Sequence, residues 1–371
     1  MVSKQKTLPQ PMALQYMPAV SAKGVERPAF CVALQGTGDV VKIEADNCAE
    51  FTDLVTKSTI SWVDYWAYDL QKDGKEAALS LGFSEGLIKQ MFNGRTHGYE
   101  DFDAELALVL PAVNVEGFEV LASPLIILIR KNLVATIHGR AVTRLVKLRR
   151  YAETFMRKIQ KNSMPQDKQT LVLVRILDEN NGRNFDHLRE IEEQGDMLSK
   201  YLMDPKTPRR TLGPKIYKMK HALITYLSTL WVSLDVLNTL RFGDAEQITD
   251  DPQLLVRVSV LSDEINRQIQ LSEHMSEVLA SGLEVLQSIY NNQLQVLNNR
   301  MALVITYLTV LGTAILVPNT LATIMSNSAF NLQPSDAGWY TALLVISTVI
   351  SSYTAYWWTK KQGALPKDAS A

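Results

Sequence analysis

Two uncharged, mostly apolar segments near the C-terminal end limit most strongly what this 371-residue chain can fold into. The first covers residues 302–325 and the second covers residues 338–358. A helix needs about 20 apolar residues to cross a bilayer, so each segment is long enough. Together with the short polar stretch at residues 326–337, they predict a transmembrane hairpin of two helices. A buried hairpin in the core of a soluble protein is the alternative.

Basic residues flank this hairpin at its two outer ends. Arg300 precedes the first span, Lys360 and Lys361 follow the second, and the connecting stretch carries no base. Positively charged residues favour the cytoplasmic side, so both termini are predicted to be cytoplasmic, including a basic tail at residues 359–371. The sequence therefore predicts a multi-pass protein of the plasma or inner membrane. Aromatic residues that suit the membrane interface lie near both ends of the second span: Trp339, Tyr340, Trp357 and Trp358.

The net charge of −1 hides an uneven distribution of charge along the chain. Lysine plus arginine number 38 and aspartate plus glutamate 39, yet Asp336 is the only charged residue between positions 302 and 358. This balance gives no support to a nucleic-acid binder, which usually carries a basic excess. Cys31 and Cys48 form no CxxC pair, which argues against a disulfide scaffold and favours a reduced, cytosol-facing domain.

The rest of the chain changes its hydrophobic pattern near residue 140. After a flexible tail at residues 1–27, six short apolar runs within residues 28–140 predict strands, with a helix at 74–92, in a cytosolic α/β domain. Residues 141–251 show helical spacing and are predicted to form helical arms. The fold class is therefore α+β. The helical runs in the arms cover residues 142–160, 171–203 and 215–240.

A long helix is predicted to begin at Asp250-Asp251-Pro252, because these residues suit a helix start. Apolar residues at nearly heptad spacing continue through a stalk at residues 252–301 into the first span. A helix from 252 to 325 would be about 110 Å long. A single domain of this size needs no such helix, whereas a stalk that packs against copies of itself does. The sequence therefore predicts a homo-oligomer.

Motifs of catalysis and nucleotide binding are absent from the sequence. It contains no G-x-x-x-x-G-K-[ST], G-x-G-x-x-G, H-E-x-x-H or G-x-S-x-G pattern. The sequence therefore predicts neither an enzyme nor a bound cofactor, and no metal site is certain. The five histidines lie far apart and are interpreted as surface or structural residues: His97, His138, His187, His221 and His274.

The order of these parts, together with four short motifs, resembles the CorA family of metal-ion transporters. Ile60–Asp64 (ISWVD) is similar to the family's tryptophan–aspartate strand, and the stretch from Gly82 to Leu110 is similar to the helix and strand that follow it. Asn298–Met301 (NNRM) is similar to the start of the first span, and Pro318–Leu321 (PNTL) to the family's Pro-x-Thr-Leu. The resemblance implies a funnel-shaped homopentamer whose first span lines the pore.

The chain departs from this family at the extracellular mouth. Counted from Pro318, the family's Gly-Met-Asn signature falls on Asn327, Ser328 and Ala329, so none of its three residues is present in register. In the family, the signature asparagines of the assembled chains form a ring that binds the hydrated cation. This chain lacks that asparagine in register, which leaves its Mg²⁺ selectivity open. Asn327, Ser328 and Asp336 are the candidates for the mouth.

A second departure concerns the family's cytosolic Mg²⁺-sensing site, which uses an acidic pair in the α/β domain and an aspartate on the neighbouring stalk. Alignment by motif spacing places Lys89, Gln90 and Gln268 at these positions. A hard dication prefers carboxylate oxygens, and a lysine carries the wrong charge. The sensing site is therefore predicted to be lost, with a displaced site at Asp263 and Glu264 as the alternative.

A third departure lies along the pore. Threonines recur at spacings of three and four in the first span, which places them on one face of a helix. Five copies would form rings of hydroxyl oxygens able to replace part of an ion's hydration shell. The alternative is that the threonines bond their own helix or a neighbouring one. The predicted pore-lining residues are Asn299, Thr306, Thr309, Thr313, Val317 and Thr320.

These observations predict passive transport of metal cations, Mg²⁺ or a related divalent ion, through a homo-oligomeric pore driven by the membrane potential. The predicted partners are copies of the chain, the lipid bilayer and the cations, without nucleic acid. A variant that carries Zn²⁺, Ni²⁺ or Co²⁺ is one alternative, although the spans offer no cysteine or histidine ligands for soft metals. A non-conducting, membrane-anchored scaffold or sensor is the other.

Overall fold

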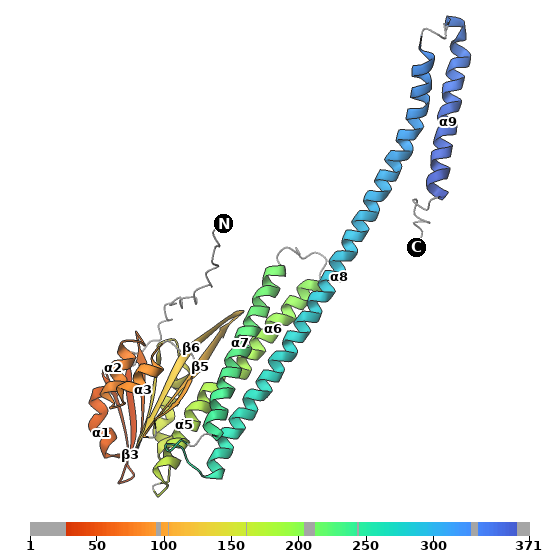
Figure 1. Cartoon of the computed structure of the whole chain (residues 1–371). Helices are drawn as coiled ribbons and strands as arrows, with labels where there is room; N and C mark the ends of the chain where they lie inside the picture. The colour runs from red at the N-terminus through yellow and green to blue at the C-terminus, as the bar shows by residue number, and fades with distance from the viewer. Residues whose placement is uncertain are drawn as a thin grey trace, which may run out of the picture. The chain divides into compact units, whose positions relative to one another are not determined.

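The computed structural model divides the chain into two compact units, Met1–Ala280 and Ser281–Ala371 (Figure 1). His97, Ser328 and most of the two predicted tails, residues 1–27 and 359–371, lie outside the described residues. The structure describes residues 27–93, 98–102, 104–160, 162–203, 212–242, 245–327 and 333–361.

A seven-stranded sheet organises the first unit, with the strand order β2-β1-β3-β7-β6-β5-β4. Strands β3 and β7 pair in parallel, and the other neighbouring strands pair antiparallel. The six predicted runs all fall within strands, whereas β4 is too short and polar to show a strand pattern in the sequence. The strands are Ala29–Gln35 (β1), Val40–Ala45 (β2), Ser58–Ala67 (β3), Gly98–Asp101 (β4), Glu105–Glu116 (β5), Glu119–Arg130 (β6) and Leu133–Gly139 (β7).

Side chains alternate between the two faces of this sheet, and helices cover both faces. On one face, alternate residues of β1 form the hydrophobic core with Phe51, Leu87 and Met91 from the short helical segments. The alternation places Trp62 and Asp64 of β3 on the opposite face, and it does the same for Thr136 and His138 of β7. The short segments are Cys48–Phe51 (η1), Thr52–Lys57 (α1), Asp73–Ser80 (α2) and Glu85–Met91 (α3), which lie together on one side of the sheet (Figure 1).

The helix predicted at residues 74–92 is two helices, α2 and α3, which corrects that expectation. Gly82 separates them with a φ of 83°, in the left-handed region that glycine adopts most easily. Ser84 then starts α3, because its Oγ accepts the amide hydrogen of Leu87 at 3.4 Å.

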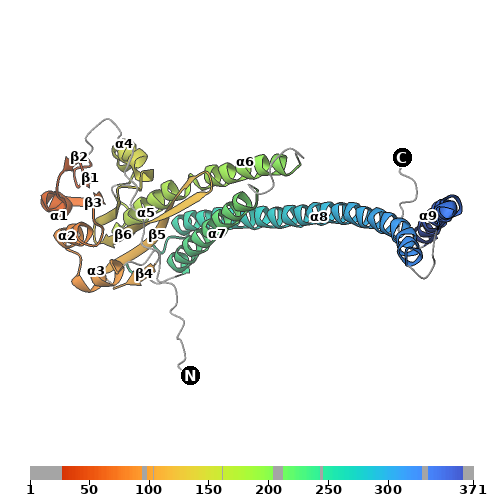
Figure 2. The same cartoon turned by 90° about the horizontal axis from the view of Figure 1, so that it is seen from above.

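Longer helices cover the other face, and α6 and α7 lie alongside the first part of α8 in both views (Figures 1 and 2). The run predicted as one helix over residues 171–203 is also two helices, which corrects a second expectation. Gly182 ends the first of them by donating its N–H to Asp178 O at 2.8 Å. The helices are Arg144–Met156 (α4), Pro165–Asn181 (α5), Asn184–Met203 (α6), Leu212–Phe242 (α7) and Pro252–Met325 (α8).

Helix α8 is 74 residues long and contributes to both units. Its start is the predicted one: Asp251 Oδ1 accepts the amide hydrogen of Gln253 at 2.9 Å, and Pro252 occupies the first helical position. The predicted stalk and first span are thus parts of one helix. The second unit continues with a 3-10 helix, Pro334–Asp336 (η4), and with α9, Ala337–Lys361.

By length and hydropathy, two of the described helices could cross a membrane, α7 and α8. In α7, 39% of the most apolar window is buried, as in a core helix, whereas none of the α8 window is buried. Helix α9, which covers the second predicted span, is not one of the two, and serine, threonine, tyrosine and tryptophan interrupt its aliphatic residues. Among the described residues of the second unit, Ser351 alone is buried.

Candidate functional site

The predicted pore-lining residues of the first span lie on one face of α8. Steps of three, four, four and three residues separate Thr306, Thr309, Thr313, Val317 and Thr320 in a single helix, so their side chains project in similar directions. Thr306 is half-buried and the other four are exposed. This threonine face is therefore available for contacts outside the chain.

All four threonine hydroxyls on this face donate their hydrogen to a carbonyl of their own helix. This own-helix bonding is the alternative that the sequence left open. A hydroxyl has one hydrogen and two lone pairs, so each oxygen still presents an acceptor on its exposed side but no donor. The bonds join Thr306 to Ala302 (2.8 Å), Thr309 to Ile305 (2.9 Å), Thr313 to Thr309 and Val310 (2.9 and 3.0 Å), and Thr320 to Val317 (2.8 Å).

Large aliphatic side chains occupy the opposite face of the same part of α8. They also recur at steps of three and four residues, and each is more than half exposed. A helix with an apolar face and a hydroxyl face suits two different surroundings, such as lipid on one side and a polar lumen on the other. The apolar face consists of Leu297, Met301, Val304, Leu308, Leu311 and Ile315.

The threonine face continues toward the start of the span as a row of exposed amides. Asn299 precedes Thr306 by two helical turns and lies on the same face. Asn292 and Gln295 extend this row and are also exposed, although the sequence prediction did not include them. Asn292 lies one heptad before Asn299, and Gln295 lies one heptad before Ala302. This spacing was the signal that could have identified them.

The candidate mouth residues do not form an open carboxylate site in the described part of the chain. Asn327 follows the end of α8, and its N–H donates to Ile324 O at 3.2 Å. The Oδ2 of Asp336 accepts the amide hydrogen of Gln333 at 3.0 Å and so caps η4. One carboxylate oxygen of Asp336 is thus already engaged, and Ser328 lies outside the described residues.

The three residues aligned with the family's sensing site differ in their exposure to solvent. Lys89 and Gln90 are exposed on α3, whereas Gln268 on α8 is fully buried. The Oε1 of Gln268 accepts a hydrogen bond from Asn184 Nδ2 at 3.2 Å, and Asn184 Oδ1 accepts one from Arg144 Nη1 at 3.0 Å. Burial lowers the pKa of Arg144 to about 10. Gln268 therefore belongs to an internal polar cluster that joins α4, α6 and α8.

The displaced acidic site also lacks a ligand cluster. Asp263 is exposed, and the half-buried Glu264 lines an open groove of about 290 Å³ between α5 and α8. Burial, and then the nearby Asp178, raise the pKa of Glu264. Within the described residues, no group of three or more histidine, cysteine, aspartate or glutamate side chains could hold a metal ion.

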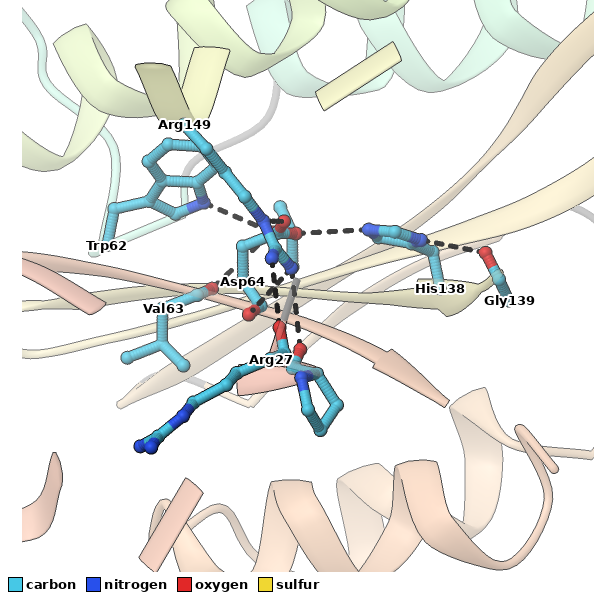
Figure 3. Close-up of polar contacts among 9 residues, drawn as sticks. Arg27, Trp62, Val63, Asp64, His138, Gly139 and Arg149 are labelled. Atoms are coloured by element: carbon cyan, nitrogen blue, oxygen red, sulfur yellow. Dashed lines mark hydrogen bonds and ion pairs between the residues drawn. The ribbon is translucent and has the colours of Figure 1, made fainter. Parts of the chain in front are cut away.

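A buried carboxylate, Asp64 of β3, lies on the sheet face that the longer helices cover, where Arg149 of α4 reaches it (Figure 3). Its Oδ2 accepts a hydrogen bond from Arg149 Nε at 2.5 Å, and its Oδ1 accepts one from Thr136 Oγ1, also at 2.5 Å. His138 Nε2 lies 3.2 Å from the same Oδ1. Burial alone would raise the pKa of Asp64, but Arg149, and then His138, hold it well below its usual range.

This Asp64 cluster is closed, because the polar side chains in it find their partners inside the chain. Trp62 Nε1 donates to Thr136 Oγ1 at 3.1 Å, and His138 Nδ1 lies 2.9 Å from Gly139 O. Both ring nitrogens of His138 therefore lie within hydrogen-bond distance of oxygens of the chain itself. His138 is thus structural, and the ISWVD aspartate supports the fold rather than an exposed ligand site.

Comparison with known proteins agrees with this architecture. The family model described as CorA-like Mg²⁺ transporter protein matches residues 57–361. The complete CorA magnesium transporter from Methanocaldococcus jannaschii is similar in fold, with a TM-score of 0.61 and 18% identity over 88% of this chain and 96% of that one. Full-length CmaX gives a TM-score of 0.60 with 16% identity over 92% and 99% of the two chains.

The cytoplasmic domain of ZntB from Vibrio parahaemolyticus gives a TM-score of 0.53, with 13% identity over 71% of this chain and 98% of that one. No curated protein sequence matches the chain. At these identities the solved structures establish the α+β fold with its long helices, and the family match covers most of the chain. The chain therefore belongs to the CorA-like family of metal-ion transporter proteins.

Proposed function

We propose that this protein carries divalent metal cations passively across a membrane, through a pathway lined by the threonine face of α8 in a ring of identical chains. Four hydroxyls on that face donate their hydrogens to their own helix, and this observation carries the proposal. A face that offers lone pairs without hydrogens favours cations over anions.

The apolar face of α8 supports a membrane location for this part of the chain. Its six side chains, from Leu297 to Ile315, are all exposed, and the chain carries no charge between Met301 and Ile315. Contact with lipid would remove this apolar surface from water. The basic residues at the outer ends of the hairpin support cytoplasmic termini.

A ring of copies is inferred from the shape of one helix. The threonine face of a single α8 cannot enclose a passage, whereas several copies around an axis would bring their faces together. The number of copies is proposed to be five, on the family resemblance. The driving force is the membrane potential, which is worth about 2.3 kcal/mol per elementary charge per 100 mV.

Mg²⁺ or a related divalent ion is the proposed cargo. Hydroxyl and amide oxygens suit hard cations, and the spans contain no cysteine or histidine for softer ones. No acidic residue occurs between Glu284 and Asp336, so neutral dipoles must supply the attraction along the pathway. A partly hydrated ion is easier to accommodate in such a pathway than a bare one.

Ion flux into proteoliposomes tests this function. Purified protein is reconstituted, a membrane potential is imposed, and the uptake of Mg²⁺, Ni²⁺, Zn²⁺, K⁺ and Cl⁻ is compared with that of empty liposomes. The proposal expects uptake of at least one divalent cation and little Cl⁻ uptake. A preference for Zn²⁺ or Ni²⁺ would favour the transition-metal variant, and no flux of any ion would favour a scaffold or sensor.

A further inference from the structure

A proline interrupts the hydrogen bonding of α8 within the threonine face. Pro318 follows Val317 and lies inside the helix. Proline has no amide hydrogen, so the helical bond that residue 318 would donate to Ala314 O cannot form. In an apolar environment a carbonyl without a donor is costly, and transmembrane helices usually satisfy it with a side chain from elsewhere.

Helix α9 supplies such a side chain. Ser351 Oγ donates to Ala314 O at 3.2 Å, which is the carbonyl that Pro318 leaves without its usual donor. Ser351 is also the one buried residue in the described part of the second unit. A second contact between the two helices, Tyr340 to Ala322 O at 3.5 Å, is different in kind, because Ala322 O already accepts the amide hydrogen of Ser326.

The serine also has a competing acceptor on its own helix. Ser351 Oγ lies 3.1 Å from Thr348 O, so its single hydrogen can serve either Thr348 O or Ala314 O. The link between the helices can therefore be released without leaving the serine unbonded. Ser347, one turn earlier, donates to Leu344 O of its own helix at 2.8 Å and offers a matched comparison.

We propose that Ser351 is a positioning residue for the ion pathway: its hydroxyl replaces the amide hydrogen that Pro318 lacks and holds α8 against α9 beside Thr313 and Val317. This inference rests on the proposed function, because it assigns the serine a role in shaping the pathway. When Ser351 Oγ donates its hydrogen to Thr348 O instead of Ala314 O, α8 would be released from α9 near Thr313 and Val317.

A double-mutant cycle tests this role. The variants Ser351→Ala, Pro318→Ala, the combination of both, and Ser347→Ala as control are compared in the full chain. Ser351→Ala is expected to lower the thermal unfolding midpoint by about 2 °C and to change the ratio of Mg²⁺ to K⁺ flux about threefold, the effect of an average interhelical hydrogen bond. Ser347→Ala should change neither quantity.

The combination with Pro318→Ala is decisive. Alanine at position 318 restores the amide hydrogen, so Ser351→Ala should have no further effect on midpoint or flux ratio in that background. Equal effects of Ser351→Ala in both backgrounds, or an effect no larger than that of Ser347→Ala, would overturn the proposal. If no chain conducts, the function fails, while the thermal cycle still shows whether Ser351 compensates for Pro318.

Discussion

The Asp64 cluster and the threonine face differ in where their polar groups find hydrogen-bond partners. The carboxylate of Asp64 is buried and finds Arg149, His138 and Thr136 within the first unit. The threonine oxygens of the second unit keep lone pairs that their own helix does not use. The buried carboxylate is therefore satisfied within the first unit, whereas the exposed oxygens of the threonine face are open to groups outside the chain.

The apolar side chains follow the same division. Trp62, Phe30 and Phe51 are almost completely buried in the first unit, whereas Leu308 and Ile315 are 65% and 60% exposed in the second. Burial of apolar area is the main favourable term in folding, so the second unit can gain this stabilisation only from a bilayer or from other copies. The apolar side chains of the first unit thus maintain its fold, whereas those of α8 are available for contacts outside the chain.

The largest effect, on stability, is expected in the buried Asp64 cluster of the first unit. Asp64→Asn should lower the free energy of unfolding of this unit by about 3–5 kcal/mol, because Arg149 loses its buried counter-charge. Hydrogen exchange of the β3 and β7 amides in the full chain measures this loss. Glu153→Gln is the control, since it removes an exposed pair with Arg157 and should cost less than about 1 kcal/mol.

Acid should remove the same stabilisation. The pKa of Asp64 is lowered in the folded state, so its contribution is complete above the unfolded pKa of about 3.9 and declines as the pH falls below that value toward the folded pKa. The difference between the Asp64→Asn variant and the original chain should therefore shrink below about pH 4. A difference that stays constant down to about pH 2 would contradict the assigned role of the carboxylate.

A smaller effect, on transport rather than stability, is expected in the second unit. Thr309→Leu should reduce divalent-cation flux about tenfold or more, because it replaces an oxygen acceptor for a charged group by an aliphatic side chain. Flux into proteoliposomes measures the change. Thr341→Leu on α9 is the control, since Thr341 is also exposed and bonds its own helix. Equal flux in the original chain and in Thr309→Leu would remove Thr309 from the pathway.

Internal Mg²⁺ is expected to have the smallest effect. Lys89 and Gln90 cannot replace a carboxylate pair, and Gln268 is buried against Asn184. Flux should therefore stay the same when millimolar Mg²⁺ is placed on the side of the membrane that holds the first unit. Inhibition by internal Mg²⁺ would show that a sensing site exists, and its loss in Asp263→Asn or Glu264→Gln would locate it on α8.

Much of the fold could be predicted because it follows from local patterns. The short apolar runs in β1 and β3, the helix start at Asp251, and the threonine spacing in α8 each depend on neighbouring residues. The break at Gly82 was missed because apolar residues continue on both sides of it. The polar stretch at residues 178–184 around Gly182 was a signal that the prediction of one helical run did not use. Strand β4 was missed because its four residues show no hydrophobic alternation.

The partners of the key residues could not be predicted, because they are distant in sequence. Arg149 and Asp64 are 85 positions apart, and Ser351 and Ala314 are 37 positions apart. The chemistry of proline indicates that a bond is missing at Pro318, but nothing in the sequence identifies the serine that replaces it. Likewise, the heptad-like pattern of α8 did not reveal that Gln268 faces the interior.

Cysteine accessibility tests the assignment of the threonine face most directly. Cys31 and Cys48 are fully buried, and burial raises the pKa of each to about 12, so the native thiols should not react at neutral pH. Single cysteines are introduced as Thr313→Cys on the threonine face and Leu311→Cys on the apolar face. Reconstituted protein is then treated with a cationic, water-soluble thiol reagent while cation flux is recorded.

The reagent should block flux through the Thr313→Cys variant and leave the Leu311→Cys variant unaffected. Block of Leu311→Cys alone, or no block of Thr313→Cys despite measurable flux, would contradict the claim that the threonine face of α8 lines the ion pathway.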